Sequence, residues 1–408
     1  MNIVLLHYAA PPVVGGVESV MARHARLMAE HGHHVCILAG RGGQTESRVE
    51  FTLLPEADSR HPEVLKLKVE LDAGRVPDEF AGLVARLVDA LRKHIGEAGL
   101  LIAHNVCSLN KNLALTAALH RITQESAAPR LILWHHDLAW TTLRYRPELH
   151  EGYPWELLRT DWPWAQQVVV SEQRRGELAE LLGVPRERID VVPNGVDARQ
   201  FLKLEDETVE LCRRLRLQDT APLMLLPVRI TPRKNIELAL RTLASLRRRV
   251  AGARLIVTGP LGPHNPANQQ YFGRLLALRQ ALGLEEAACF LAEVVDHSIP
   301  DAVIADLYKL ADLLFLPSRE EGFGIPVLEA GLAGIPVFCA DIEALRELGG
   351  GQVTYFSPDA DPGQLAEQIA AALEADPTYG LHQRALNDYS WERIYLSKIA
   401  PLLAKGTE

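Results

Sequence analysis

The sequence predicts an α/β protein built from two doubly wound domains. Short apolar runs alternate with amphipathic stretches of helical period along almost all of the 408 residues, and this alternation starts again a little beyond the middle of the chain. Short apolar runs bounded by turn residues are typical of parallel strands that are buried on both faces. At roughly 150 residues per domain, the length also favours two or three domains. We therefore expect two parallel sheets, each covered by helices on both faces.

The first half of the chain supplies one set of strands and helices. The expected strands are IVLLH from residue 3, VCILA from 35, LLIAH from 100, RLILWH from 130, QVVVS from 167 and IDVV from 189. The expected helices lie at 17–30, 79–94, 110–122 and 173–182. Because strands and helices alternate, this half should form one doubly wound sheet.

The second half repeats the pattern. The expected strands are PLMLLPV from residue 222, RLIVTG from 254, CFLAE from 289, DLLFLPS from 312, PVFCA from 336 and VTYF from 353. PNGVD at 193–197 is typical of a turn and LEDETVE at 204–210 is polar, so the junction should lie near 195–218. We assign residues 1–200 to the first domain and 201–388 to the second, with a further helical pattern at 389–408.

Composition excludes several classes of function. The net charge of −9 argues against nucleic acid or an anionic membrane as an obligate partner. No stretch approaches the ~20 apolar residues of a membrane span, although peripheral membrane contact stays open. The N-terminal apolar run is too short for a signal peptide, and the five cysteines form no CxxC pair or zinc spacing. We expect a cytoplasmic protein with reduced cysteines.

The most informative stretch is SREEGFGIPVLEAGLAGIPV at 318–337. It predicts a glycine-rich loop that enters a short helix, with Pro326 in the first turn and Gly334 at the end. Glycines let backbone N–H groups approach a ligand, and a helix N-terminus favours anions and hydroxyl oxygens. Glu321 and Glu329 flank this loop, and carboxylates accept hydrogen bonds from pairs of hydroxyl groups, such as those of a nucleotide sugar.

A pair of cations is expected at the carboxyl edge of the second sheet. In VRITPRKNIELAL, a strand ends at Val228 and a helix begins near Asn235, which places Arg229 and Lys234 on the usual ligand side. A guanidinium and an ammonium group can together neutralise a diphosphate. Arg233 lies between them and is interpreted as solvated.

The first domain carries weaker signals. Gly15 and Gly16 precede the first helix, which is not the G-x-G-x-x-G fingerprint of a dehydrogenase but still places glycines where a phosphate or sugar would meet helix amides. His135 and His136 end a strand; adjacent strand residues point to opposite faces, so a metal site formed by this pair is not favoured. The alternative to a functional role is a histidine buried in the core whose hydrogen bonds are made within the protein.

The spacing E-G-F-G-x-x-x-x-E, together with R-x-x-x-x-K-N about ninety residues earlier, resembles the signature of family 4 of the retaining glycosyltransferases, also called glycosyl transferases group 1. The resemblance implies the GT-B fold, in which two Rossmann-like domains face a central cleft. The first would bind the acceptor and the second the nucleotide-sugar donor, and the C-terminal helix would cross back onto the first domain. The donor would be a UDP- or GDP-sugar and the acceptor a hydroxyl group of a small molecule or glycan, with no cofactor.

The resemblance also implies roles for individual residues. Catalytic roles fall on Arg229, Lys234, Glu321 and His136. Donor contacts fall on Gly15, Gly16, Gly259, Ser318, Gly322, Phe323, Gly324 and Glu329. Acceptor contacts fall on His104, Asn105 and Arg144. The chain departs from the family in one place, because Asp137 stands where threonine or serine is more usual, and His135 competes with His136 for the role of the histidine.

Other interpretations stay open at this point. Asp359 and Asp361 spell the DxD of metal-dependent glycosyltransferases, but they fall in a polar, proline-flanked segment, which predicts a turn and no metal site. A GT-B epimerase of nucleotide sugars or a non-catalytic nucleotide-sugar-binding partner would share the fold and the donor. The sequence does not identify the donor base, the sugar or the acceptor.

Overall fold

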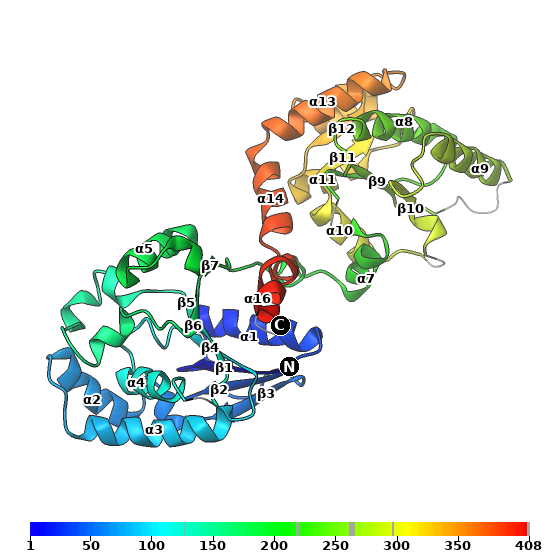
Figure 1. The fold of residues 1–408 in the computed structure, drawn as a ribbon. Helices are drawn as coiled ribbons and strands as arrows, with labels where there is room; N and C mark the ends of the chain where they lie inside the picture. Colours follow the sequence, from blue (N-terminus) through cyan, green and yellow to red (C-terminus); the bar gives the residue numbers. More distant parts are fainter. Residues whose placement is uncertain (126, 218–219, 261–265, 296–297, 406–408) are drawn as a thin grey trace. The chain divides into compact units, whose positions relative to one another are not determined.

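The computed structural model describes residues 1–125, 127–217, 220–260, 266–295 and 298–405 and divides the chain into two compact units (Figure 1). Unit 1 comprises Met1–Gly195 and Trp391–Glu408, and unit 2 comprises Val196–Ser390. The expected boundary between residues 200 and 201 lies five residues further along the chain. The helical pattern expected at 389–408 includes residues 406–408, which lie outside the described part of the chain.

Unit 1 contains a parallel sheet of seven strands in the order β3-β2-β1-β4-β5-β6-β7. The strands are β1 (Asn2–His7), β2 (His34–Ala39), β3 (Val49–Leu53), β4 (Leu100–His104), β5 (Arg130–His135), β6 (Ala165–Val169) and β7 (Ile189–Val191). The six predicted strands are confirmed. The sequence analysis missed β3, which lies at the edge of the sheet and is half exposed, so its composition lacks the continuous apolar run of a central strand.

Helices cover both faces of this sheet. They are α1 (Gly16–Glu30), α2 (Pro62–Asp72), α3 (Glu79–Ile95), α4 (Leu113–Ile122) and α5 (Glu172–Leu182). Because side chains alternate along a strand, Val4 and Leu6 of β1 enter the core under α3 and α4, whereas Ile3 and Leu5 enter the core under α1. Figure 1 shows α1 and α3 on opposite sides of the sheet.

The end of the chain is part of unit 1. It forms α15 (Trp391–Ile394), a π-helical turn (Tyr395–Ile399) and α16 (Ala400–Ala404). Ile394, Tyr395 and Ile399 are buried in the same core as α1. The Arg130 guanidinium donates hydrogen bonds to the carbonyl oxygens of Leu402 (2.7 Å) and Leu403 (3.1 Å). The C-terminal segment therefore packs on the same face of the sheet as α1.

Unit 2 contains a parallel sheet of six strands in the order β10-β9-β8-β11-β12-β13. The strands are β8 (Leu223–Leu226), β9 (Arg254–Val257), β10 (Ala288–Phe290), β11 (Leu313–Leu316), β12 (Val337–Ala340) and β13 (Thr354–Phe356), and all were predicted. The helices are α6 (Ala198–Leu202), α7 (Asp206–Arg214), α8 (Ile236–Arg247), α9 (Pro266–Ala281), α10 (Asp301–Leu310), α11 (Ile325–Ala333), α12 (Glu343–Gly349), α13 (Pro362–Ala375) and α14 (Pro377–Asp388).

Both sheets have the strand order of a doubly wound Rossmann-like domain, which confirms the predicted fold class. In each sheet the order reverses between the first and fourth strands, β1 and β4 in unit 1 and β8 and β11 in unit 2. Ligands of such sheets bind beyond the carboxyl ends of the strands at this switch point. Within the described residues, no helix has both the length and the apolar character that crossing a bilayer requires.

Candidate active site

The switch point of unit 2 is lined by the motifs that the sequence analysis selected. Arg229 follows β8, which ends at Leu226, two residues earlier than expected, and Ser318 follows β11. Gly259 follows β9. A pocket of about 740 Å³ lies beside these strand ends, and Arg229, Gly259 and Glu329 are among its lining residues. Arg229 is exposed to solvent, so its charge is available to a ligand in the pocket.

Two glycines in this region are required by their surroundings. A Cβ atom at Gly259 would lie 2.0 Å from the carbonyl oxygen of Val228, so only glycine lets the loops after β8 and β9 pass this closely. Gly324 has a φ of 99° and caps the N-terminus of α11, which is a left-handed conformation that glycine adopts without strain. Pro326 and Gly334 occupy the predicted first turn and C-cap of the helix.

Lys234 and Glu321 form an ion pair between the segments that follow β8 and β11. The distance from Lys234 Nζ to Glu321 Oε1 is 2.5 Å, and the side chains are only 9% and 8% exposed. The Ser318 hydroxyl donates to the same carboxylate oxygen at 2.7 Å. The other oxygen, Oε2, has no hydrogen-bond partner within the described part of the chain, so it can accept a hydrogen bond from a ligand hydroxyl.

Asn235 fixes the loop that carries Lys234. Its φ of 51° is left-handed, and its side-chain amide donates to the carbonyl oxygens of Pro317 (3.1 Å) and Pro358 (2.9 Å). The Asn235 side chain therefore joins the loops that follow β8, β11 and β13, and it holds Lys234 beside Ser318. This joining role depends on tertiary contacts, and the sequence analysis did not find it.

Glu329 of α11 is held by a residue that the sequence analysis missed. The Tyr308 hydroxyl, on α10, donates to Glu329 Oε2 at 2.7 Å. Burial and the Glu329 carboxylate raise the pKa of Tyr308 above its ordinary value, so this tyrosine keeps its proton and acts as a donor. The Tyr308 contact fixes the carboxylate, and Glu329 is among the residues that line the pocket.

Several nearby residues lie outside this arrangement. Gly322 and Phe323 are exposed, with 55% of Phe323 accessible, and neither lines the pocket. Arg233 is exposed, as expected. Asp359 forms an ion pair with Arg319 at 2.6 Å, whereas Asp361 caps α13, so the structure assigns both aspartates local roles around a turn. No group of three or more His, Cys, Asp or Glu side chains among the described residues is arranged to hold a metal ion.

The switch point of unit 1 is surrounded by histidines. His7 ends β1 and His104 ends β4, and His136 directly follows β5. His7 donates through Nδ1 to the carbonyl oxygen of His104 at 2.7 Å. The ring atoms His104 Nδ1 and His136 Nε2 are 3.1 Å apart. Two of the residues predicted to contact ligands, His104 and His136, therefore touch each other.

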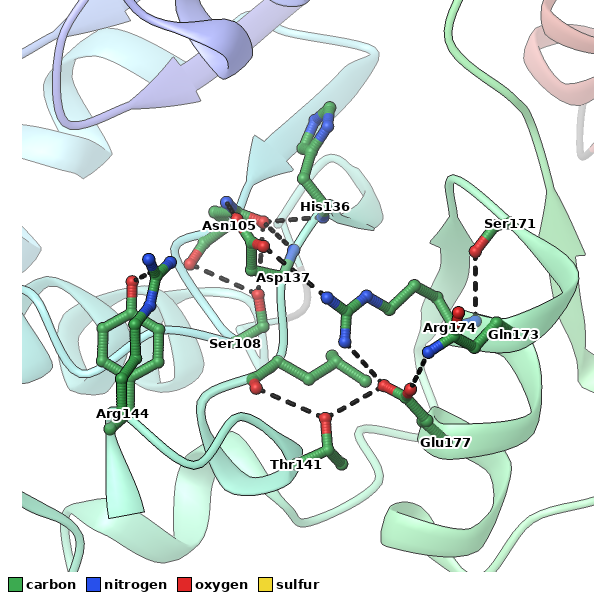
Figure 2. Close-up of polar contacts among 12 residues, drawn as sticks. Asn105, Ser108, His136, Asp137, Thr141, Arg144, Ser171, Gln173, Arg174 and Glu177 are labelled. Carbon is green, nitrogen blue, oxygen red and sulfur yellow. Dashed lines mark hydrogen bonds and ion pairs between the residues drawn. The ribbon is translucent and has the colours of Figure 1, made fainter. Parts of the chain in front are cut away.

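Asn105 anchors the loop that follows β5. Its Oδ1 accepts hydrogen bonds from the backbone N–H groups of His136 (2.7 Å) and Asp137 (3.2 Å), as Figure 2 shows. Asn105 has a φ of 57°, and only 1% of the residue is exposed. Asn105 therefore has a structural role here, because its side-chain oxygen is occupied by the backbone of its neighbours, and its predicted contact with an acceptor stays a prediction.

His135 and His136 differ in their surroundings. His135 Nε2 is 2.8 Å from Gln167 Oε1 on β6, inside the sheet, and burial lowers the pKa of His135 to about 4. Burial, with the neighbouring histidines His24 and His7, lowers the pKa of His136 to about 3. Both rings are neutral at pH 7. His135 has a hydrogen-bond partner in the core. His136, which directly follows β5, is therefore the histidine at the rim, that is, at the carboxyl edge of this sheet.

The remaining predicted residues of unit 1 lie around this rim. Gly15 caps α1 and Gly16 begins it, at the carboxyl end of β1. Arg144 is exposed, and its guanidinium lies over the Tyr145 ring with 4.7 Å to the centroid. The sequence analysis missed a charged group on α5: Arg174 is paired with Glu177 at 2.6 Å and lies 3.8 Å from Asp137 (Figure 2).

Comparison with known families identifies the class to which this fold and site belong. The family described as "Glycosyltransferase Family 4" matches residues 14–200 of unit 1, and the family described as "Glycosyl transferases group 1" matches residues 210–388 of unit 2. The chain belongs to glycosyltransferase family 4, whose fold class is GT-B, as the sequence analysis expected.

Individual relatives are more distant. A protein named D-inositol 3-phosphate glycosyltransferase from Nocardia farcinica is 32% identical over 183 residues, which cover 44% of this chain and 38% of the relative. A GDP-mannose-dependent α-(1-6)-phosphatidylinositol monomannoside mannosyltransferase from Mycobacterium tuberculosis is 31% identical over 179 residues, 42% of this chain and 43% of the relative. These matches span less than half the length of either relative. The crystal structure of a glycosyltransferase from Rickettsia africae aligns over 99% of both chains with 16% identity and a TM-score of 0.37.

Proposed function

We propose that this protein is a retaining glycosyltransferase that moves a sugar from a nucleotide diphosphate sugar to a hydroxyl acceptor. The observation that supports this most strongly is the arrangement at the switch point of unit 2. There, Arg229 and Glu329 line one pocket, Lys234 pairs with Glu321, and each of the two carboxylates is fixed through one oxygen. Such a set can bind a diphosphate and two groups of hydroxyls together.

The donor is held in three parts. Arg229 and Lys234 neutralise the diphosphate, and the N-terminus of α11 adds backbone N–H groups. Glu329 Oε1 accepts from the ribose hydroxyls beside the pocket, and Glu321 Oε2 accepts from the transferred sugar. The base lies against the loop of Thr258 and Gly259, which lines the pocket.

The reaction proposed is a front-side displacement. The bond between the anomeric carbon and the diphosphate oxygen breaks, and a bond from the acceptor oxygen to the same face of that carbon forms. The acceptor proton passes to the diphosphate oxygen that leaves. Arg229 and Lys234 stabilise the negative charge that develops on this group, and their electrostatic contribution can supply several kcal/mol. No cofactor takes part.

Unit 1 supplies the acceptor side, with His136 facing the transferred sugar. The donor is a UDP- or GDP-sugar; the name of one relative specifies GDP-mannose, and the names of both favour an acceptor that contains inositol, a polyhydroxylated compound. The five unpaired cysteines suit a reducing compartment, and we place the protein in the cytoplasm.

The test measures donor turnover with and without acceptor. A thermal-shift screen with UDP-, GDP- and ADP-sugars first selects the donor, because a ligand that binds only the folded protein raises its melting temperature. Turnover that requires an acceptor, with retention at the anomeric carbon of the product seen by NMR, supports the proposal. Conversion of the donor without an acceptor would indicate an epimerase, and binding without turnover a non-catalytic partner. Inversion at the anomeric carbon would refute the retaining mechanism.

A further inference from the structure

The contact between His104 and His136 assigns a role to a residue that is too buried to act on a ligand itself. His104 is 0% exposed, at the end of β4, and its ring stacks on Trp134 with centroids 5.5 Å apart. We propose that His104 is a positioning residue that holds His136 as a neutral ring with its proton on Nδ1, so that His136 offers one fixed hydrogen-bond donor to a ligand hydroxyl.

The fixed geometry of the pair is the first step. The ring nitrogens His104 Nδ1 and His136 Nε2 are 3.1 Å apart. The backbone N–H of His136 donates to Asn105 at 2.7 Å, and the carbonyl of His104 accepts from His7 at 2.7 Å. Both the ring and the backbone of His136 are therefore anchored to the end of β4. Figure 2 shows the His136 ring directed away from the side chains of Asn105 and Asp137.

Proton counting then gives the direction of the hydrogen bond. If His136 donated through Nε2, neutral His104 would carry its proton on its own Nε2, which is buried and has no hydrogen-bond partner among the described residues. A buried N–H group without an acceptor loses a full hydrogen bond to water and is rare in folded proteins. If His104 instead donates through Nδ1, its buried Nε2 carries only a lone pair, and no N–H group is left without an acceptor. This second arrangement is therefore favoured.

Neutrality of both rings follows from their surroundings. Burial lowers the pKa of His104 well below its ordinary value, and the nearby rings of His136, His24 and His7 lower it further. With His104 as the donor, His136 Nε2 is the acceptor, and the proton of neutral His136 must lie on Nδ1. Nδ1 has no hydrogen-bond partner among the described residues and is not completely buried, so it can donate to a ligand.

The chemistry of this donor selects its partner. A single neutral N–H suits a hydroxyl oxygen, whereas a charged imidazolium would favour a phosphate. That the hydroxyl belongs to the transferred sugar rests on the proposed function. The tautomer of His136 does not depend on that assignment and can be measured without any substrate.

The experiment reads the tautomer directly by NMR. Full-length protein labelled with ¹⁵N-histidine is examined at pH 7.5 through long-range ¹H–¹⁵N correlations, and His136→Gln assigns the His136 signals. The expected result is a protonated Nδ1 and a bare Nε2. His104→Asn keeps an amide donor near the position of Nδ1 and should preserve this pattern. His104→Leu removes the donor and should shift His136 toward the Nε2-protonated form. A protonated Nε2 in the unsubstituted protein would overturn the proposal.

Activity measurements test the role of the tautomer. His104→Leu should lower kcat about tenfold, which corresponds to the loss of one hydrogen bond, while nucleoside diphosphate affinity and the backbone NMR spectrum stay unchanged. His104→Asn should keep kcat within about threefold. Equal kcat in His104→Leu and the unsubstituted protein refutes the positioning role. If the unsubstituted protein transfers no sugar at all, the proposed function fails, yet the NMR spectrum still decides whether His104 fixes the ring.

Discussion

Lys234 and Glu321 form a buried ion pair whose Nζ–Oε1 distance is 2.5 Å. A buried pair of this kind is costly to desolvate, so it is weak evidence for stability. Its position beyond the carboxyl ends of β8 and β11 indicates a ligand-binding purpose, because within the described part of the chain two of the Lys234 N–H groups and one Glu321 oxygen have no hydrogen-bond partner. A diphosphate and a sugar hydroxyl would complete the coordination of the two groups.

Chelation of metal ions should leave activity unchanged. In the proposed mechanism, Arg229 and Lys234 supply the two positive charges that a divalent cation supplies in a metal-dependent enzyme, so EDTA should alter the transfer rate by less than about twofold. Initial rates measured with EDTA in excess over metal ions, at roughly 5–10 mM, check this expectation. A complete loss that Mg²⁺ or Mn²⁺ restores would contradict it and would point back to Asp359 and Asp361.

The two glutamates should separate nucleotide binding from transfer. Glu329→Ala removes hydrogen bonds from a charged group to the ribose, a loss of about 1.5–3 kcal/mol, and should weaken nucleoside diphosphate binding roughly ten- to a hundredfold. Glu321→Ala should leave that affinity almost unchanged and lower transfer. Tyr308→Phe, which keeps the ring but frees Glu329 Oε2, should weaken nucleotide binding by about tenfold or less. Calorimetry with the bare nucleotide measures all three, and equal losses for the two glutamates would disprove this division of roles.

Much of the fold could be predicted because parallel strands buried on both faces have an apolar composition that stands out locally. The segment Leu313–Leu316 is apolar throughout and was easy to find, whereas Val49–Leu53 lies at an edge, mixes polar and apolar residues, and was missed. The helix at Pro62–Asp72 was also missed, since its apolar stripe is weak and only three of its residues are buried.

The candidate site could be predicted where its chemistry follows a short motif. Arg229, Lys234, Glu321 and Glu329 were selected from short motifs and from the family that these motifs resemble, and their roles in binding and catalysis stay predictions. The residues that orient them come from distant segments: Tyr308 reaches Glu329 from another helix, and His104 meets His136 across neighbouring strands. Such contacts depend on strand order, which a single sequence does not display.

His135 and His136 should respond differently to alanine. His136→Ala should lower turnover without changing nucleoside diphosphate affinity, because the described residues that line the pocket proposed for the nucleotide all belong to unit 2. His135→Ala should instead destabilise unit 1 by about 1–3 kcal/mol, since it leaves the buried Gln167 amide without its partner. Kinetics and thermal unfolding of both variants distinguish these effects. A selective loss of turnover in His135→Ala alone would show that the catalytic assignment is displaced by one residue.

Unit 1 should lose stability as the pH falls from about 6.5 to about 4. The pKa values of four buried histidines are lowered by burial, to about 4 for His7 and His135 and about 3 for His24 and His136. Between these pH values the unfolded chain binds protons at the four histidines and the folded chain does not. The free energy of unfolding therefore decreases as the pH drops. At pH 5.5 each of these histidines lowers the free energy of unfolding by on the order of 1 kcal/mol.

His24→Phe tests this pH dependence. His24 is fully buried, and neither ring nitrogen has a hydrogen-bond partner among the described residues, so phenylalanine removes a titrating group without breaking a bond. The denaturation midpoint of the variant should fall less steeply with pH than that of the unsubstituted protein. Exposed His34, replaced by glutamine, is the matched control and should leave the slope unchanged. Parallel slopes for all three proteins would show that buried histidines do not determine acid stability.

Gly259→Ala should damage the pocket and the stability of unit 2 together. The added methyl group would lie 2.0 Å from the Val228 carbonyl oxygen and 2.5 Å from the Cα atom of Arg229, and both are backbone atoms that cannot rotate away. Overpacking of this kind costs typically 1–3 kcal/mol, so the melting temperature should fall by roughly 2–12 °C for a unit of this size. Because Arg229 must move, nucleotide affinity should fall as well. Gly273→Ala, on α9 with no atom within 4 Å of the added carbon, is the matched control and should be neutral or slightly stabilising. Differential scanning calorimetry with and without nucleotide measures both effects, and an unchanged melting temperature for Gly259→Ala would show that the loops after β8 and β9 are not packed as closely as the structure describes.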